Sequence, residues 1–201
     1  MGGFVEIADR YAPDAALVVV DMQVDFGSTD GGLYVRGGEE IVEIVNAEVE
    51  AALAAGAVVA YTQDWHPATT PHFAKDGGIW PVHCVQDTPG AQLLPGLRVD
   101  GPVVRKGTSG EDGYSGFSVR DPVTGETAST ELGSLLVTAG VRTVVVVGLA
   151  GDYCVKETAL DAARLGYETL VPLPATRFVN LAEGDDERAI EDMRAAGVTV
   201  R

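Results

Sequence analysis

The chain has 201 residues, of which 46% are hydrophobic, and this length fits one core, so we expect a single domain over residues 1–201. No apolar run approaches the roughly 18 residues that a membrane span needs, and the N-terminus lacks a signal-peptide pattern, which predicts a cytoplasmic protein without a membrane partner. The formal net charge of −16 and the absence of Lys/Arg clusters argue against nucleic acid and favour a neutral or cationic small molecule as the partner.

Short runs rich in β-branched residues alternate with helical patterns along the chain. The runs lie at residues 16–20, 57–61, 102–105, 143–148, 168–171 and 198–200, and we interpret them as six strands. Apolar residues at helical spacing predict helices around residues 41–53, 155–165 and 190–193, each followed by a glycine. This alternation predicts an α/β fold with three α/β/α layers around a Rossmann-like, six-stranded, mostly parallel sheet.

Three chemically active side chains stand at the ends of these strands. Asp21 follows the first strand, Lys106 ends the third, and Cys154 opens the helix that follows the fourth strand and a Gly-rich turn. Parallel sheets bind ligands at the carboxyl ends of their strands, so these side chains are expected to meet. Because a helix start and a nearby lysine stabilise a thiolate, we interpret Cys154 as a nucleophile rather than a structural cysteine. Arg105 should face the other way.

The segment of residues 65–102 is long and weakly periodic, and it carries all three histidines of the chain. Loops of this length are usually functional or disordered, and the histidines and aromatic residues favour function. One carboxylate and three imidazoles would suit one divalent metal ion, Zn in the first place and Fe or Mn otherwise, with open positions for water or substrate. The candidate ligands are Asp64, His66, His72 and His83. A closed structural zinc site that includes Cys84 is the alternative; otherwise Cys84 is expected to be structural.

Together these residues resemble the nicotinamidase/pyrazinamidase family of isochorismatase-like cysteine hydrolases, over nearly the whole chain. The resemblance is carried by D-M-Q-V-D-F from Asp21, D-W-H-P from Asp64 with His72, W-P-V-H-C-V-Q-D-T-P-G from Trp80, K-G from Lys106 with Y-S-G-F from Tyr114, and G-L-A-G-D-Y-C-V from Gly148. Two features depart from the family pattern. Gly151 stands where Thr is frequent, and P-A-T-T-P before His72 is an unusual spacer.

The resemblance implies the isochorismatase-like hydrolase fold and the hydrolysis of nicotinamide, and of pyrazinamide, through a cysteine thioester in NAD salvage. It makes Cys154 the nucleophile, Asp21 the general base and Lys106 the activating charge. It further implies an oxyanion hole, a cis peptide bond before Ala150, three contacts to the substrate ring and a metal ion that holds the pyridine nitrogen. The residues concerned are Ala150 and Cys154 for the oxyanion hole, Phe26, Trp80 and Tyr114 for the substrate, and Asp64, His66, His72 and His83 for the metal.

Other hypotheses stay open at this point. An amidase of the same fold could act on another small amide or a ureido acid, and an inactive binding or scaffold protein would keep the fold without the reaction. A dinucleotide-binding oxidoreductase is a poor match, because its G-x-G-x-x-G motif does not follow the first strand. The sequence does not decide between a monomer and a homo-oligomer.

Overall fold

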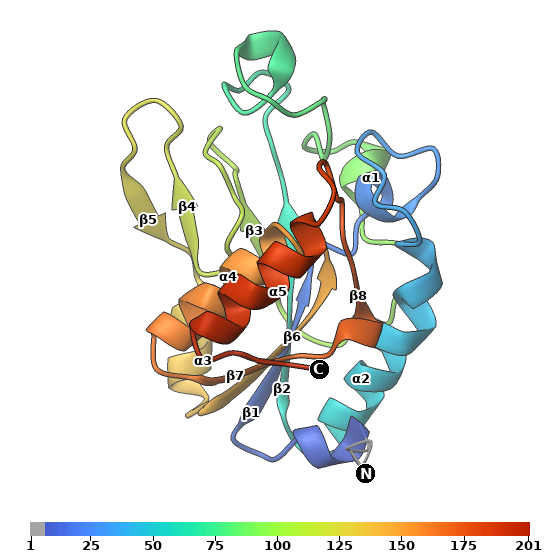
Figure 1. Cartoon of the computed structure of the whole chain (residues 1–201), viewed down its shortest axis with the longest axis vertical. Coiled ribbons are helices and arrows are strands. Elements are labelled where there is room, and N and C mark those ends of the chain that lie inside the picture. The colour runs from blue at the N-terminus through green and yellow to red at the C-terminus, as the bar shows by residue number, and fades with distance from the viewer. Residues whose placement is uncertain (1–6) are drawn as a thin grey trace.

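The computed structural model describes residues 7–201. The centre of the molecule is a parallel sheet (Figure 1). Its strands run in the order β3-β2-β1-β6-β7-β9, and the two-residue strand β8 pairs with the end of β6. The strands are β1 (Ala15–Val20), β2 (Val58–Asp64), β3 (Val103–Lys106), β6 (Thr143–Leu149), β7 (Glu168–Val171), β8 (Thr176–Arg177) and β9 (Thr199–Val200). Every pairing in this sheet is parallel, so the carboxyl ends of the strands share one edge.

Helices cover both faces of the sheet. Helix α2 (Val42–Ala54) packs on one face, and α3 (Leu132–Thr138), α4 (Cys154–Arg164) and α5 (Asp185–Ala195) pack on the other. The remaining elements are the short helix α1 (Val24–Gly27), the hairpin of β4 (Ser118–Arg120) and β5 (Thr127–Ser129), and 3-10 turns at Ile7–Arg10, Glu39–Ile41, Ala74–Asp76, Pro89–Ala91 and Leu173–Ala175. The predicted three-layer α/β/α architecture is therefore confirmed.

Strand β1 explains how one apolar run serves two cores. Successive side chains of a strand point to opposite faces. Leu17 and Val19 pack in the core beneath α2, whereas Val18 and Val20 pack in the core beneath α4. A strand that is buried on both faces needs apolar residues at every position, which is why this segment reads as a continuous apolar run.

The six predicted strands are all present, and the helices predicted around residues 41–53, 155–165 and 190–193 correspond to α2, α4 and α5. The structure adds β8, the β4–β5 hairpin, α1 and α3, which were not predicted. These elements have two to seven residues, too few for a hydrophobic period to stand out.

The long segment after β2, coloured teal to green in Figure 1, rises beyond the carboxyl edge of the sheet. It is packed although it has little regular structure. Phe73 and Trp80 are buried and form an isolated bridge, and a second bridge joins His66 to Val85. The segment is therefore packed against itself where it covers the strand ends.

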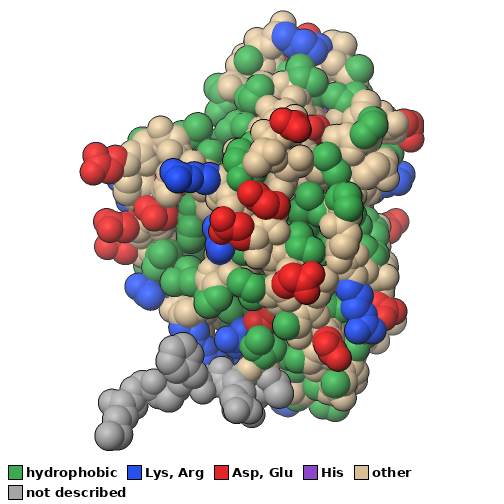
Figure 2. Space-filling model, turned by 90° about the vertical axis from the view of Figure 1, so that its right-hand side faces the viewer, with side chains coloured by type: hydrophobic (Ala, Val, Ile, Leu, Met, Phe, Trp, Pro, Cys, Tyr) green, Lys and Arg blue, Asp and Glu red, His purple; other side chains and the backbone are tan. Residues whose placement is uncertain are grey.

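The outer surface reflects the acidic composition. Figure 2 shows acidic side chains spread over one face of the molecule among apolar ones, and no histidine is visible on that face. Within residues 7–201, no helix is long and apolar enough to cross a membrane.

Candidate active site

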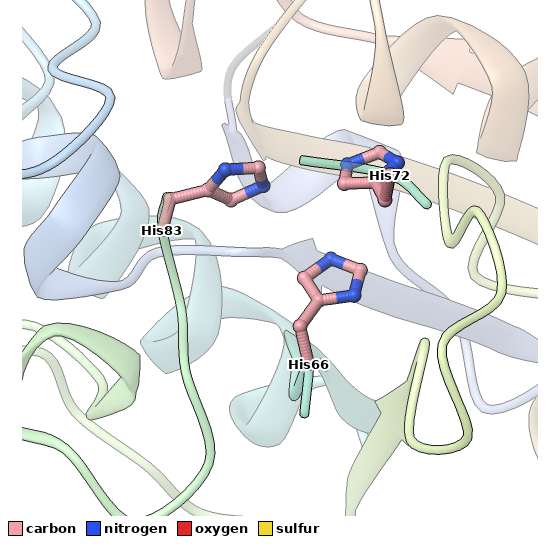
Figure 3. Close-up of side chains that lie close together, drawn as sticks. All are labelled: His66, His72 and His83. Atoms are coloured by element: carbon pink, nitrogen blue, oxygen red, sulfur yellow. The ribbon is translucent and has the colours of Figure 1, made fainter. Parts of the chain in front are cut away.

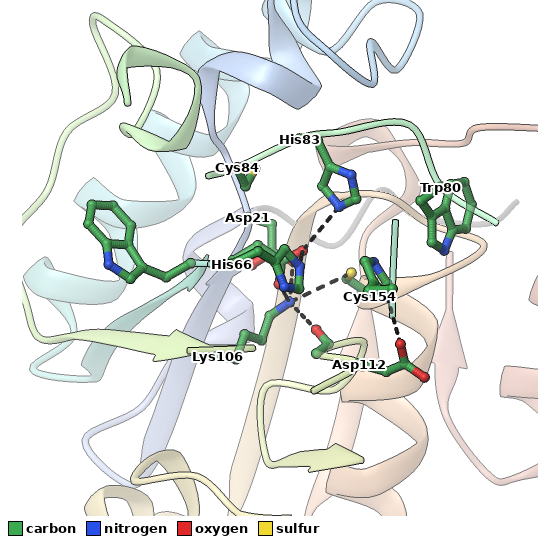
Figure 4. Close-up of polar contacts among 12 residues, drawn as sticks. Asp21, His66, Trp80, His83, Cys84, Lys106, Asp112 and Cys154 are labelled. Atoms are coloured by element: carbon green, nitrogen blue, oxygen red, sulfur yellow. Dashed lines mark hydrogen bonds and ion pairs between the residues drawn. The ribbon is translucent and has the colours of Figure 1, made fainter. Parts of the chain in front are cut away.

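Asp21, Lys106 and Cys154, here called the cysteine group, lie together at the carboxyl edge of the sheet (Figure 4). The Lys106 Nζ atom lies 2.7 Å from Asp21 Oδ2 and 3.8 Å from Cys154 Sγ. It also contacts Asp64 Oδ1 and donates a hydrogen bond to the Gly113 carbonyl. All members of the group are buried, and Lys106 is only 1% exposed. The three side chains expected to meet at the strand ends do so.

Side chains alternate between the two faces of a strand, and this alternation decides which residues of β3 face the cysteine group. Lys106 shares its face of β3 with Val104, which packs in the core beneath α4. Arg105 points to the opposite face, where its guanidinium lies 3.8 Å from the centre of the Trp65 ring. The expectation that Arg105 faces away from the site is therefore confirmed.

Lys106 is a buried cation between two buried carboxylates. Burial raises the pKa of Asp21 to about 6, although the Lys106 charge opposes this shift. Burial also raises the pKa of Asp64, but Lys106, His66 and His83 together outweigh it, and the pKa ends well below the usual carboxyl range. Burial lowers the pKa of Lys106, and the two carboxylates reverse this, so that the pKa ends well above its usual range. Asp21 is thus the carboxylate of the pair that is better suited to accept a proton near neutral pH.

The Cys154 thiol departs from the expectation of a stabilised thiolate. Burial raises its pKa, Lys106 lowers it, and Asp21 and Asp64 raise it again, so the pKa lies well above the usual thiol value. The sequence shows the helix start but not the two carboxylates that face the sulfur. A base must therefore take the thiol proton, and a carboxylate oxygen of Asp21 lies within 4.8 Å of Sγ.

The turn between β6 and α4 presents backbone N–H groups beside the sulfur. The Leu149–Ala150 peptide bond is cis, as the resemblance implied. Within the described part of the chain, the N–H groups of Ala150 and Cys154 donate no hydrogen bond to the backbone, and both residues line the same cavity. Two free donors at a helix start can stabilise a developing oxyanion.

Two glycines shape this turn. Gly148 has φ of +111°, and a Cβ there would lie 2.1 Å from the Val20 carbonyl oxygen. A Cβ at Gly151 would come within 2.5 Å of the Phe178 ring. The ring of Phe178 thus occupies the space that a Thr side chain would need, which accounts for the departure from the family pattern at position 151.

His66, His72 and His83, here called the histidine group, converge beside the cysteine group. Figure 3 shows their rings pointing toward one another, and one nitrogen from each lies within 4.8 Å of the others. Burial lowers the pKa of His83 to about 4, which keeps that ring neutral, the form that binds metals. Both ring nitrogens of His66 are buried and without a hydrogen-bond partner among residues 7–201. Unpaired buried nitrogens are costly, so this donor set fits a metal ion.

Asp64 connects the two groups. Its Oδ2 lies 3.5 Å from His66 Nε2 and 3.9 Å from His83 Nε2, while Oδ1 contacts Lys106. Asp64 thus adjoins two of the three histidines, although its carboxylate belongs to the set of potential ligands formed with Asp21 and Cys154 and not to the set formed by His66, His72 and His83. The sulfur of Cys84 does not belong to the group of potential ligands among the described residues, so the geometry favours a site without Cys84 over the closed zinc site.

One cavity reaches both groups. Its empty space, with the open mouth included, is about 430 Å³. Phe26, Trp80 and Tyr114, the predicted ring contacts, all line it, and the Trp80 Nε1–H donates a 2.8 Å hydrogen bond to the Tyr114 hydroxyl. Their contact with a substrate stays a prediction.

Sequence reasoning missed several residues of the site. Tyr153 and Val179 line the cavity. The Thr62 hydroxyl donates a 2.6 Å hydrogen bond to Asp21 Oδ1, and the Asp112 carboxylate lies 2.6 Å from His72 Nδ1. Thr62 could have been found, because it is a polar residue two positions before Asp64 and so shares its face of β2. Asp112 had no comparable signal, since it comes from another loop.

The fold and the cysteine group define a hydrolase built on a three-layer α/β/α sheet. The Isochorismatase domain family matches residues 15–201. The chain therefore belongs to the isochorismatase family, in its nicotinamidase/pyrazinamidase branch.

Three relatives illustrate this membership. A nicotinamidase of Escherichia coli is 36% identical over 206 residues, which cover 94% of each chain. The structure of the pyrazinamidase of Pyrococcus horikoshii in complex with zinc is similar with a TM-score of 0.83 and 37% identity, over 94% of this chain and 99% of that one. PnC1 from L. infantum in complex with nicotinate gives a TM-score of 0.85 with 35% identity, over 95% of this chain and 94% of that one.

Proposed function

We propose that this protein is a nicotinamidase, which hydrolyses nicotinamide to nicotinate and ammonia, a reaction of NAD salvage, and also hydrolyses pyrazinamide. The proposal depends on one observation: Cys154 and two residues of the histidine group, His72 and His83, line the same cavity. A cysteine group alone supports amide cleavage without naming the amide. A cluster of ligand nitrogens beside the sulfur favours an amide attached to a ring that itself carries a metal-binding nitrogen.

The proposed reaction begins at Cys154. Asp21 accepts the thiol proton as Sγ attacks the amide carbon, and Lys106 holds the charges of the sulfur and Asp21 in place. The N–H groups of Ala150 and Cys154 stabilise the negative oxygen that forms. Asp21 then returns the proton to the leaving nitrogen, the C–N bond breaks, and ammonia leaves a thioester on Cys154.

The second half of the reaction releases the acid. Asp21 removes a proton from a water molecule, whose oxygen attacks the thioester carbon. The C–S bond breaks, nicotinate leaves, and the thiol recovers its proton from Asp21. The buried hydrogen bond from Thr62 supports this role, because it fixes the Asp21 carboxylate throughout both halves.

The histidine group and Asp64 would hold one divalent metal ion, Zn in the first place and Fe or Mn otherwise. When bound, the ion supplies a fixed Lewis-acid partner for the ring nitrogen of the substrate. Phe26, Trp80 and Tyr114 would surround the ring with apolar and aromatic surface.

An ammonia-release assay with the purified protein tests this proposal. Nicotinamide, pyrazinamide and a ureido acid are compared as substrates, each before and after treatment with a chelator. We expect both ring amides to be hydrolysed and the chelator to slow the reaction. Preference for the ureido acid, with no effect of the chelator, would assign the protein to another amide. No hydrolysis of any substrate by metal-loaded protein would favour a binding role.

A further inference from the structure

The three histidines differ in what their second ring nitrogen contacts. His72 Nδ1 lies 2.6 Å from an Asp112 carboxylate oxygen, and His83 Nδ1 lies 2.7 Å from the Pro81 carbonyl oxygen. His66 has no such partner within residues 7–201. An acceptor at Nδ1 keeps the proton on that nitrogen and leaves the Nε2 lone pair free for a metal. His72 is therefore the member of the group whose ring is set by a charged side chain.

Asp112 reaches His72 from a different loop, 40 residues away in sequence. Its own backbone is held on both sides: its N–H donates to the Arg120 carbonyl at 2.8 Å, and its carbonyl accepts from the Arg120 N–H at 2.9 Å. These bonds tie the residue to the end of β4. The backbone that carries the carboxylate is thus held in position.

A second tie joins the same two loops. The Thr70 hydroxyl donates a 2.7 Å hydrogen bond to the Gly110 carbonyl and accepts a 3.2 Å bond from the His72 N–H. His72 is therefore held at its backbone through Thr70 and at its ring by Asp112. The side chains of His72 and Asp112 are only 4% and 19% exposed, so water screens their contact weakly.

We propose that Asp112 is a positioning residue that fixes the ring and the tautomer of His72 for metal binding. The inference rests on the metal site of the proposed function. A carboxylate accepts more strongly than a carbonyl and makes the imidazole a better donor. Asp112 therefore raises the metal affinity of the site, although it lies in a loop that the sequence did not connect with the histidine group.

The test measures Zn²⁺ and Co²⁺ binding to the metal-depleted full chain by competition with a chromophoric chelator. Asp112→Ala is expected to weaken binding by about 10 to 100-fold, as loss of such a partner does elsewhere. Asp112→Asn should recover part of this loss, because its amide oxygen can still accept from Nδ1–H. The matched control is Glu111→Ala, which removes a neighbouring carboxylate whose one hydrogen bond within residues 7–201 comes from the Ser109 N–H, and it should leave binding unchanged.

Two further variants show whether Asp112 acts through His72. In the background of His72→Ala, the Asp112→Ala change should not weaken metal binding further. The two single variants should alter the visible absorption of bound Co²⁺ in the same direction. Unchanged metal affinity in Asp112→Ala, or losses that multiply in the double variant, would overturn the inference alone. A wild-type protein that binds neither ion would overturn the metal site of the proposed function as well.

Discussion

The cysteine group and the histidine group border the same cavity, but different forces hold them there. Asp21 and Lys106 end strands whose register is set by backbone hydrogen bonds, and Cys154 opens a helix that packs on the same sheet. The histidines belong to a segment with little regular structure, and hydrogen bonds to a carboxylate and to a loop carbonyl set the rings of two of them. The residues proposed for the reaction are thus placed by the sheet, whereas those proposed for metal binding are placed by loops.

The largest effect is expected from removal of the sulfur. Cys154→Ala should lower ammonia release from nicotinamide by at least about 10⁴-fold, because a covalent step is lost. Its metal content, measured by atomic emission, should stay at the wild-type value. Cys84→Ala is the control, since that buried thiol does not reach the cavity, and it should keep most of its activity. Full activity in Cys154→Ala would contradict the proposed mechanism.

A smaller loss is expected from the proposed base. Asp21→Asn keeps the shape of the side chain but cannot accept the thiol proton, so kcat/KM should fall by about 10² to 10⁴-fold. Steady-state kinetics with nicotinamide measure the change. Thr62→Val, which removes only the hydrogen bond to Asp21, should cost less than Asp21→Asn. An Asp21→Asn enzyme as fast as the wild type would show that another group serves as base.

A change in the histidine group should lower both metal content and activity, whereas Cys154→Ala should lower activity alone. His83→Ala removes one of the converging nitrogens, so the bound metal should fall below one ion per chain and kcat/KM for nicotinamide should drop by about 10²-fold. Cys154 should remain present as a thiol that iodoacetamide can label under denaturing conditions. If His83→Ala bound metal as tightly as the wild type, His83 would not be a ligand.

The close approach of Gly148 in β6 to the Val20 carbonyl of β1 can be tested by measurements of stability. Gly148→Ala combines a left-handed φ with a Cβ only 2.1 Å from the Val20 carbonyl, and we expect it to lower the free energy of unfolding by about 2 to 5 kcal/mol. Gly166→Ala is the matched control, because φ is also positive but the surroundings are open, and it should cost about 1 to 2 kcal/mol. Urea unfolding measures both, and equal losses would refute the close approach.

The same contrast explains what could be predicted from the sequence. Apolar runs predicted the six strands, and with them the meeting of Asp21, Lys106 and Cys154, because the ends of parallel strands share one edge. The clustering of all three histidines after Asp64 predicted the histidine group, and the resemblance added its role toward the substrate, but its convergence depends on loop contacts without periodicity. The contact between Asp112 and His72 joins two loops 40 residues apart, so no local pattern could reveal it. The raised pKa of the Cys154 thiol was likewise hidden, since it depends on the burial of the sulfur and on the nearby carboxylates of Asp21 and Asp64.

In the proposed function, the same cavity serves both to cleave the amide and to recognise the ring nitrogen of the substrate. The most direct test compares nicotinamide with benzamide, which has the same amide and ring size but no ring nitrogen, on metal-loaded and metal-depleted protein. We expect metal-loaded protein to prefer nicotinamide by at least about 100-fold in kcat/KM and this preference to disappear when the metal is removed. Equal rates for the two amides on loaded protein, or a preference that survives metal removal, would contradict it.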